Sequence, residues 1–242
     1  MSAAVEAQRL ATAGLHRKLV VAETFGPTFQ GEGPSMGQQA LFIRLSRCNL
    51  HCPGCDTPET WDWSRYNPRE VATRHSVEDL AAWVMSRPVA RVVLTGGEPL
   101  LQQEQLVGLA RLLPGRRIEV ETNGTIVPLP ELVELVEAFN VSPKLAGFAA
   151  PGDRRINMEA LRSLASCGKA RFKFVVRDTI ELDEVAALVE EFSLTDIWVM
   201  PEGASGAAVL TGMRRLADAV LACGWNLSTR LHVLIWEAER GR

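Results

Sequence analysis

Short apolar runs alternate with segments of helical periodicity along most of this 242-residue chain. The runs are a few residues long and rich in Val, Ile, Leu and Phe, which predicts strands. We place the strands, with the turns that end them, at 19–25, 40–46, 91–99, 117–125, 140–144, 170–176, 196–203 and 228–236. Apolar residues recur every three to four positions between them, which predicts helices over 77–85, 100–113, 130–139, 157–166, 180–192 and 207–224.

This alternation, repeated about six times, predicts an α/β fold with a mostly parallel sheet and helices outside it. A closed barrel of eight such units typically takes ~250 residues, and the chain is short for that once loops are removed. We therefore expect a partial, open β/α barrel of about six strand–helix units. Residues 1–18 are expected to form an N-terminal tail, and 19–242 a single domain.

Polar motifs follow several of the predicted strands. The motifs are Cys48, Thr95 to Glu98, Glu121 to Gly124, Ser142 to Lys144 and Met200 to Glu202. The carboxyl ends of parallel strands meet at one edge of a sheet, and ligands collect there. We therefore expect motifs far apart in the sequence to form one site.

Composition and charge narrow the function classes. The formal net charge of −3 gives no basic footprint for nucleic acid. No apolar run approaches the ~18 residues that span a bilayer, and the N-terminus lacks the apolar segment of a secretory signal. A transit peptide is a weak alternative. Five cysteines, odd in number and clustered, favour a reducing compartment and metal or redox chemistry. We expect a cytoplasmic protein that binds neither nucleic acid nor membranes.

Three of the five cysteines lie within eight residues, spaced C-x3-C-x2-C: Cys48, Cys52 and Cys55. Three thiolates can hold three irons of a [4Fe–4S] cluster and leave one iron with an open coordination position. A structural zinc site, with His51 or a distant cysteine as fourth ligand, is the alternative, although no second pair with zinc-finger spacing is present. Cys167 directly follows a predicted helix and Cys223 falls on one, and there cysteine usually acts as a small buried hydrophobe.

The cysteine motif after one strand and Gly96-Gly97-Glu98-Pro99 after the next resemble the radical S-adenosylmethionine superfamily. The resemblance implies that the open iron binds S-adenosylmethionine, which the reduced cluster cleaves to methionine and a 5′-deoxyadenosyl radical. It assigns Gly96, Gly97 and Glu98 to the methionine ammonium of this cofactor. Further cofactor contacts are expected from Gly54, Asp56, Thr122, Asn123, Ser142, Lys144, Met200, Pro201 and Glu202.

The loop Gln30-Gly31-Glu32-Gly33 precedes the cysteines, and Cys55-Asp56-Thr57 closes them. With this order of motifs the chain resembles the 7-carboxy-7-deazaguanine synthase family, which makes the deazapurine precursor of queuosine-type nucleosides. The resemblance implies substrate contacts from Phe29, Gln30, Gly31, Glu32, Arg44, Thr95 and His232, and a Mg²⁺ contact from Thr57. Arg44 can clamp a carboxylate with two hydrogen bonds, or form a salt bridge at the barrel rim. Read alone, Thr57 is a turn residue, and His232 is as often a core residue.

The sequence departs from the superfamily at one position. The residue before the last cluster cysteine is commonly an aromatic that packs near adenine, and here it is Gly54. We expect the adenine contact to come from backbone, or from Trp61 or Trp63, for which core packing is the alternative role.

The resemblance implies a radical ring contraction of 6-carboxy-5,6,7,8-tetrahydropterin to 7-carboxy-7-deazaguanine with loss of ammonia. It implies a homodimer and a flavodoxin- or ferredoxin-type electron donor. Two alternatives stay open. A glycyl-radical-enzyme activase shares the cysteine loop and GGEP but has no use for Gln30 to Gly33, and a zinc-stabilised binding module would need no cluster.

Overall fold

The computed structural model describes residues 18–150, 152, 154–237 and 239–241, so most of the predicted tail lies outside the described residues. In this part of the chain nine strands form one sheet in the order β3-β1-β2-β4-β5-β6-β7-β8-β9. The strands are β1 (Lys18–Phe29), β2 (Gln39–Leu45), β3 (Thr73–Ser76), β4 (Arg91–Gly96), β5 (Arg117–Thr122), β6 (Ala138–Val141), β7 (Ala170–Val176), β8 (Ile197–Pro201) and β9 (Asn226–Leu227). Every pairing from β2 to β9 is parallel, whereas β1 runs antiparallel to both β2 and β3.

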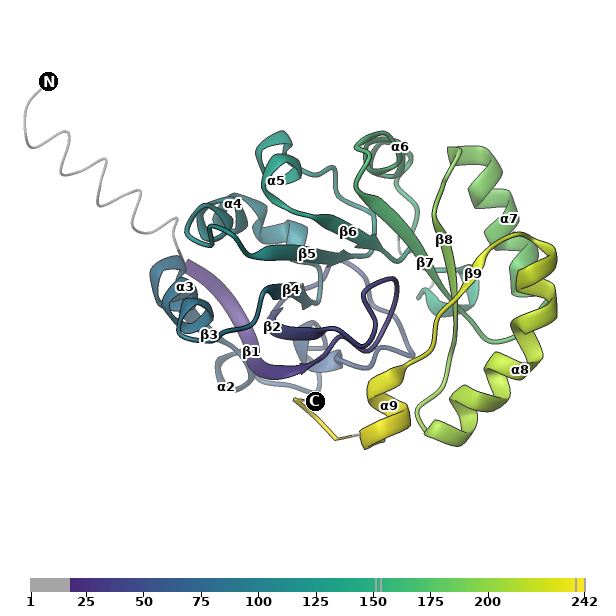
Figure 1. Cartoon of the computed structure of the whole chain (residues 1–242), viewed down its shortest axis with the longest axis horizontal. Coiled ribbons are helices and arrows are strands. Elements are labelled where there is room, and N and C mark those ends of the chain that lie inside the picture. The colour runs from purple at the N-terminus through teal and green to yellow at the C-terminus, as the bar shows by residue number, and fades with distance from the viewer. Residues whose placement is uncertain (1–17, 151, 153, 238, 242) are drawn as a thin grey trace, which may run out of the picture.

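Helices cover the outside of the curled sheet, as Figure 1 shows for α3 to α8. The α-helices are α2 (Pro68–Val71), α3 (Val77–Met85), α4 (Gln103–Arg111), α5 (Pro130–Leu135), α6 (Met158–Ser166), α7 (Glu181–Phe192), α8 (Gly206–Ala222) and α9 (Leu231–Trp236). Short 3₁₀ turns lie at η1 (Pro58–Thr60), η2 (Pro99–Gln102) and η3 (Ala146–Phe148). Side-chain caps fix several helix starts. The hydroxyl of Ser76 accepts from Asp79 N before α3, and Asn157 caps α6 in the same way.

The sheet curls into a barrel that stays open between its two ends. Within the described residues, the two end strands of the sheet, β3 and β9, do not pair with each other. The loop after β1 reaches the segment after β9, where Gly33 N donates to Ser228 Oγ over 2.8 Å and Leu231 N donates to Gly31 O over 2.8 Å. The predicted partial, open barrel is therefore confirmed, and this loop bridges its two sides.

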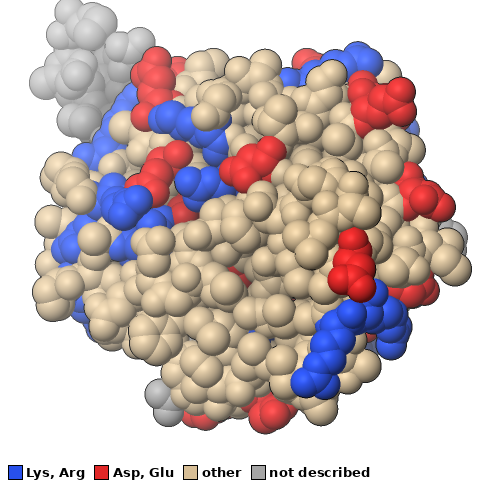
Figure 2. Space-filling model, turned by 45° about the vertical axis from the view of Figure 1, so that its right-hand side comes forward, with Lys and Arg blue, Asp and Glu red and all other residues tan. Residues whose placement is uncertain are grey.

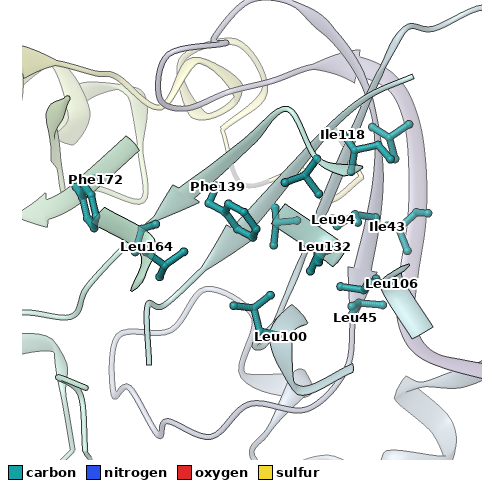
Figure 3. Close-up of a cluster of buried hydrophobic side chains, with 14 of the residues drawn as sticks. Ile43, Leu45, Leu94, Leu100, Leu106, Ile118, Leu132, Phe139, Leu164 and Phe172 are labelled. Carbon is teal, nitrogen blue, oxygen red and sulfur yellow. The ribbon is translucent and has the colours of Figure 1, made fainter. Parts of the chain in front are cut away.

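The hydrophobic core lies between the sheet and the outer helices. Figure 3 shows Leu45, Leu94 and Phe139 from the strands beside Leu106 and Leu132 from the helices. All five side chains are buried. Burying one such side chain contributes roughly 1.5–3 kcal/mol, so this layer fixes the strand ends that carry the polar motifs.

Two sequence predictions are wrong. The helix predicted over 130–139 ends at Leu135, and strand β6 begins at Ala138. The strand predicted over 228–236 is instead helix α9, so His232 lies on a helix. Short apolar runs fit a buried strand and a buried helix equally well, and packing decides between them. Strand β3 and helix α2 were not predicted, because their polar segments carry no clear period.

The molecular surface is mixed in charge. On the face shown in Figure 2, Lys and Arg side chains lie interspersed with Asp and Glu side chains rather than in one field of a single sign. No helix among the described residues is long and apolar enough to cross a membrane.

Candidate active site

A cavity of about 520 Å³ opens at the carboxyl ends of the parallel strands. It is lined by most of the residues that the sequence singled out: Phe29, Gln30, Gly31, Glu32, Arg44, Cys48, Cys52, Gly54, Cys55, Asp56, Thr57, Thr95, Gly96, Gly97, Thr122, Asn123, Ser142, Lys144, Met200, Glu202 and His232. Glu98 and Pro201 are not among the lining residues. The tertiary structure thus brings together motifs that lie far apart along the chain.

The cysteine loop leaves the end of β2 and passes over the cavity. Its base is fixed because Arg47 N donates to Thr60 O over 2.7 Å, and Cys55 N donates to Cys52 O over 3.1 Å. The amide Nδ2 of Asn123 lies 3.9 Å from Cys48 Sγ and donates to Asn49 Oδ1 over 3.0 Å, which ties the loop to the end of β5. These hydrogen bonds therefore hold the loop in one position, with its cysteines at the cavity.

The three cysteines fit an iron–sulfur cluster better than they fit a single metal ion. Among the described residues no three His, Cys, Asp or Glu side chains gather as ligands of one ion. A cubane cluster takes one thiolate at each of three irons, so its ligands need not converge on one ion. Burial raises the pKa of the Cys48 thiol to about 12, and a coordinated thiol is deprotonated by its metal. Three thiols around one cavity are the donor set that an iron–sulfur cluster uses.

Gly96 and Gly97 lie against the backbone that leads into the cysteine loop. A Cβ on Gly96 would lie 2.0 Å from Leu45 O, and one on Gly97 would lie 2.0 Å from Arg47 O. Gly97 N donates to Leu45 O over 3.0 Å. The sequence indicated that these glycines allow a ligand to approach. The structure shows that they first allow the cysteine loop itself to approach the end of β4.

The carboxylate of Glu98 is fully buried and faces the protein rather than the cavity. Its Oε1 accepts from Leu100 N over 2.9 Å and from Thr122 Oγ1 over 2.8 Å, and its Oε2 accepts from Asn123 N over 2.7 Å. Burial raises the pKa of Glu98, and hydrogen bonds from these donors oppose that effect. Glu98 therefore joins the ends of β4 and β5, which is a structural task that the sequence motif does not reveal. Pro201 likewise faces α8, where a Cβ on Gly212 would lie 2.6 Å from it.

Glu32 is the centre of a charged cluster in the wall of the same cavity. It forms ion pairs with Lys173 of β7 and with Arg230, whose Nε lies 3.1 Å from Glu32 Oε1. Nε2 of His232 lies 4.0 Å from the same oxygen. Burial alone would raise the pKa of Glu32, but the charges of Lys173 and Arg230 outweigh burial and lower it well below its usual range. Glu32 is therefore a carboxylate at neutral pH, with acceptor oxygens at the cavity wall.

Arg230 joins three loops at the rim of the cavity. Besides Glu32, its guanidinium donates to Gly203 O over 2.8 Å and to Asp56 Oδ2 over 2.9 Å. Burial would lower the pKa of Arg230, but Glu32 and Asp56 raise it. Burial lowers the pKa of His232, so its imidazole favours the neutral form. The loop after β1, the cysteine loop and the loop after β8 are thus held in one arrangement.

Glu121 at the end of β5 organises a second group of polar side chains. Gln30 Nε2 donates to Glu121 Oε1 over 3.0 Å, and Thr95 Oγ1 donates to Glu121 Oε2 over 2.7 Å. The predicted site residues Gln30 and Thr95 are therefore held by a carboxylate that the sequence noted only as part of a strand-end motif.

Arg44 forms the rim salt bridge that was its alternative role, and Thr57 lies in a turn, whereas their substrate and Mg²⁺ contacts stay predictions. Arg44 lines the cavity, while its Nε lies 3.3 Å from Glu23 Oε2 and its guanidinium lies 5.5 Å from the Phe25 ring centroid. Arg44 thus makes a rim salt bridge and also lines the cavity. Thr57 Oγ1 lies 3.7 Å from Cys55 Sγ, and its carbonyl accepts from Thr60 Oγ1 in a turn.

The two tryptophans near the cysteines line different cavities. Trp61 lines the cavity, whereas Trp63 lines a second hollow. A Cβ on Gly54 would meet nothing within 4 Å, so the cavity is open at the position where an aromatic is common. On the cofactor side, Lys144 Nζ lies 3.1 Å from Ser142 Oγ.

Sequence reasoning missed several cavity residues, including Lys173, Arg230 and Asn140. One signal was available: Lys173 stands between Phe172 and Phe174 in the largely apolar strand ARFKFVV, where an unpaired charge would be costly. Arg230 gave no such signal, because it precedes a helix that was predicted as a strand.

The chain matches known proteins over most of its length. The family model described as "Radical SAM superfamily" matches residues 42–177. The chain is 35% identical to the 7-carboxy-7-deazaguanine synthase of Pyrobaculum aerophilum over 89% of this chain and 94% of the relative. It is also 35% identical to the enzyme of that name from Hyperthermus butylicus, over 94% and 97% of the two chains. The crystal structure of QueE from Escherichia coli superposes with a TM-score of 0.70 at 27% identity, covering 92% of this chain and 98% of that one. The chain belongs to the 7-carboxy-7-deazaguanine synthase family of the radical SAM superfamily.

Proposed function

We propose that this protein converts 6-carboxy-5,6,7,8-tetrahydropterin to 7-carboxy-7-deazaguanine by a radical ring contraction that releases ammonia. The observation that carries the proposal is the meeting of two motifs in one cavity. Three cysteine thiols and the Gln30-Gly31-Glu32 loop line the same cavity. Relatives that match most of the chain bear the name of this activity. The product is a precursor for deazapurine nucleosides such as queuosine.

We assign the [4Fe–4S] cluster to Cys48, Cys52 and Cys55. S-adenosylmethionine would lie against Gly96, Gly97, Asn123 and the Ser142–Lys144 pair, with Met200 and Glu202 at the far end. When bound, the reduced cluster and S-adenosylmethionine supply a 5′-deoxyadenosyl radical that takes a hydrogen atom from the substrate. The protein's own part is to keep the cysteine loop, the end of β4 and the end of β5 in fixed positions, which Glu98 and Asn123 do.

The substrate side is suited to a pterin. The ring edge of a pterin presents N–H donors, and Glu32 and Glu121 offer carboxylate acceptors. A buried group that pairs with a specific substrate N–H rejects analogues that lack it, because the protein group is then left unpaired. Gln30 and Thr95 are already oriented by Glu121 and add an amide and a hydroxyl. His232 adds a neutral imidazole beside Glu32.

The substrate carboxylate is assigned to Arg44 and a Mg²⁺ ion held through Thr57. Arg44 lines the cavity and keeps donors besides the Nε that pairs with Glu23. Mg²⁺ favours oxygen ligands and usually keeps several waters. One threonine hydroxyl and the substrate carboxylate are therefore enough to hold the ion, with waters as its other ligands. The ion would orient the carboxylate during rearrangement.

We also propose a cytoplasmic homodimer with one catalytic domain over 19–242, reduced by a flavodoxin- or ferredoxin-type protein. The comparisons favour neither the activase nor the zinc-binding module. Glu32, Lys173 and Arg230 bring ion pairs to the cavity, which suits a small polar substrate better than a protein chain.

The test is anaerobic reconstitution with iron and sulfide, followed by reduction and incubation with S-adenosylmethionine and the carboxytetrahydropterin. We expect a brown protein that forms the deazaguanine, with loss of product in Glu32→Gln. Titrating Mg²⁺ in the wild type and in Thr57→Ala tests the ion site, since only the wild type should respond strongly. Cofactor cleavage without any conversion of the pterin would overturn the assignment of substrate, and a colourless zinc-loaded protein would overturn the cluster.

A further inference from the structure

A second hollow, of about 240 Å³, lies beside the chain segment that leads into the first cysteine. Its walls include Ser46, Arg47, Trp63, Arg69 and Arg74. We propose that this hollow is the docking surface for an acidic one-electron carrier protein that reduces the cluster. The proposal rests on the proposed function, because a cluster that cleaves its cofactor reductively needs an electron from outside the chain.

The three arginines of the hollow are exposed and gather without counter-ions. Within the described residues, none of Arg47, Arg69 and Arg74 has a carboxylate within 4.0 Å. Some arginines elsewhere are paired, as Arg91 is with Glu119 and Arg117 is with Glu137, and the hollow is distinguished by three arginines gathered at one opening. Three like charges around one hollow repel each other, and an acidic partner removes that repulsion on binding.

An exposed aromatic completes the surface. The side chain of Trp63 stays 43% exposed although it is large and apolar. Arginine and tryptophan are enriched in protein–protein interfaces and dominate their binding energy. A site for a free small anion would instead enclose its ligand with buried donors, and these three arginines lie at the surface. A nucleic-acid groove would need a longer basic stripe, and the chain carries a net charge of −3.

The hollow and the cluster loop share a wall. Ser46 and Arg47 line the hollow, while the next residue, Cys48, lines the active-site cavity. A carrier seated on the hollow would therefore contact the segment that leads into the cysteine loop, so only that loop separates it from the cluster. One electron leaves the reduced carrier and one electron enters the cluster, so the carrier is oxidised as the cluster is reduced. The substrate cavity stays free, because the hollow and the cavity share no lining residue.

The test compares two charge-reversal double variants of the reconstituted enzyme. Arg69→Glu/Arg74→Glu alters the hollow, and Arg111→Glu/Arg214→Glu makes the same change in net charge on α4 and α8, at exposed arginines outside both cavities. Binding of an acidic flavodoxin is measured by biolayer interferometry at low and at high salt. Product formation is measured with reduced flavodoxin and, separately, with dithionite.

We expect the hollow variant to bind flavodoxin at least about tenfold more weakly, and the wild-type affinity to fall as salt rises. Its turnover with flavodoxin should fall accordingly, while its turnover with dithionite equals that of the wild type. Arg69→Lys/Arg74→Lys, which keeps the charge, should retain most of the binding. The control variant should behave as the wild type.

Equal flavodoxin binding by the wild type and the hollow variant would overturn the proposal, as would an equal loss in the control variant. Binding of a transfer RNA that depends on Arg69 and Arg74, with flavodoxin binding unchanged, would also overturn it. If the wild type makes no product with dithionite, the proposed function fails instead, and the binding measurement still decides the docking surface.

Discussion

Gly31 and His232 lie in contact although they belong to opposite ends of the chain. A Cβ on Gly31 would lie 2.0 Å from Nδ1 of His232, and Leu231 N donates to Gly31 O over 2.8 Å. The missing side chain at position 31 therefore lets α9 pack on the loop after β1. This contact sets the imidazole in the cavity wall, 4.0 Å from the carboxylate of Glu32.

The first prediction concerns this contact. Gly31→Ala should lower the free energy of unfolding by about 1–3 kcal/mol, because the new methyl group displaces the imidazole. The KM for the pterin should rise, since Glu32 lies beside the displaced ring. Urea denaturation and steady-state kinetics measure the two effects. Gly54→Ala is the control for stability, because a Cβ there meets nothing within 4 Å.

A double variant separates the clash from other causes. In Gly31→Ala/His232→Ala the ring is gone, so the stability should return to that of His232→Ala alone. If Gly31→Ala is as stable as the wild type, the packing of α9 on this loop is looser than described.

The second prediction concerns the Lys173–Glu32 ion pair. Removing Lys173 leaves the buried Glu32 with Arg230 as its remaining ion-pair partner, so Lys173→Met should lose about 3 kcal/mol of stability at pH 7, at the low end for a broken buried pair. Because the pKa of Glu32 is lowered on folding, its stabilising contribution is present above the ordinary carboxyl pKa of about 4.3 and is lost as pH falls below it. The difference between wild type and variant should therefore shrink as pH falls below about 4.3.

Urea denaturation between pH 7 and pH 3 checks this dependence. Glu32→Gln/Lys173→Met should be less destabilised than the sum of the single variants, since the two side chains interact directly. A difference that stays constant over the whole pH range would contradict the assigned ion pair.

The third prediction divides the cysteines. Cys52→Ala should abolish both cluster incorporation and cofactor cleavage, because Cys52 lines the cavity. Cys223→Ala should change neither, since Cys223 is exposed at the C-terminal end of α8. Iron content and the visible absorbance of the reconstituted proteins are the measurements. Equal loss of iron in both variants would show that the division is wrong.

The fourth prediction concerns Glu98, which joins the ends of β4 and β5. Glu98→Gln places an amide NH₂ where a carboxylate oxygen now accepts a hydrogen bond, so at least one of three donors loses its partner. We expect a loss of about 2 kcal/mol and a lower iron content, because the turn that meets the cysteine loop shifts. Glu104→Gln on the exposed side of α4 is the matched control. An unchanged melting temperature in Glu98→Gln would mean that these hydrogen bonds add nothing.

The sequence by itself determined the local features of this protein. Cys48, Cys52 and Cys55 lie within one short loop. A loop of that length can present three thiols to the same site whatever surrounds it. The alternation of apolar runs and helical periods determined the open barrel, because each element buries one side and the period reports which side. The Gln30–Gly33 motif and the family resemblance then pointed to the pterin.

Only the tertiary structure decided what holds the site together. Lys173 lies 141 residues from Glu32, and Arg230 lies 174 residues from Asp56, so no local pattern connects them. Glu98 belongs to a recognised motif, yet its buried carboxylate faces β5 rather than the cavity. The apolar segment around His232 fitted a strand as well as a helix, and its packing against Gly31 made it α9. Sequence periodicity reports whether a residue is buried, whereas the partner of a buried charge depends on which strand ends the folded sheet brings side by side.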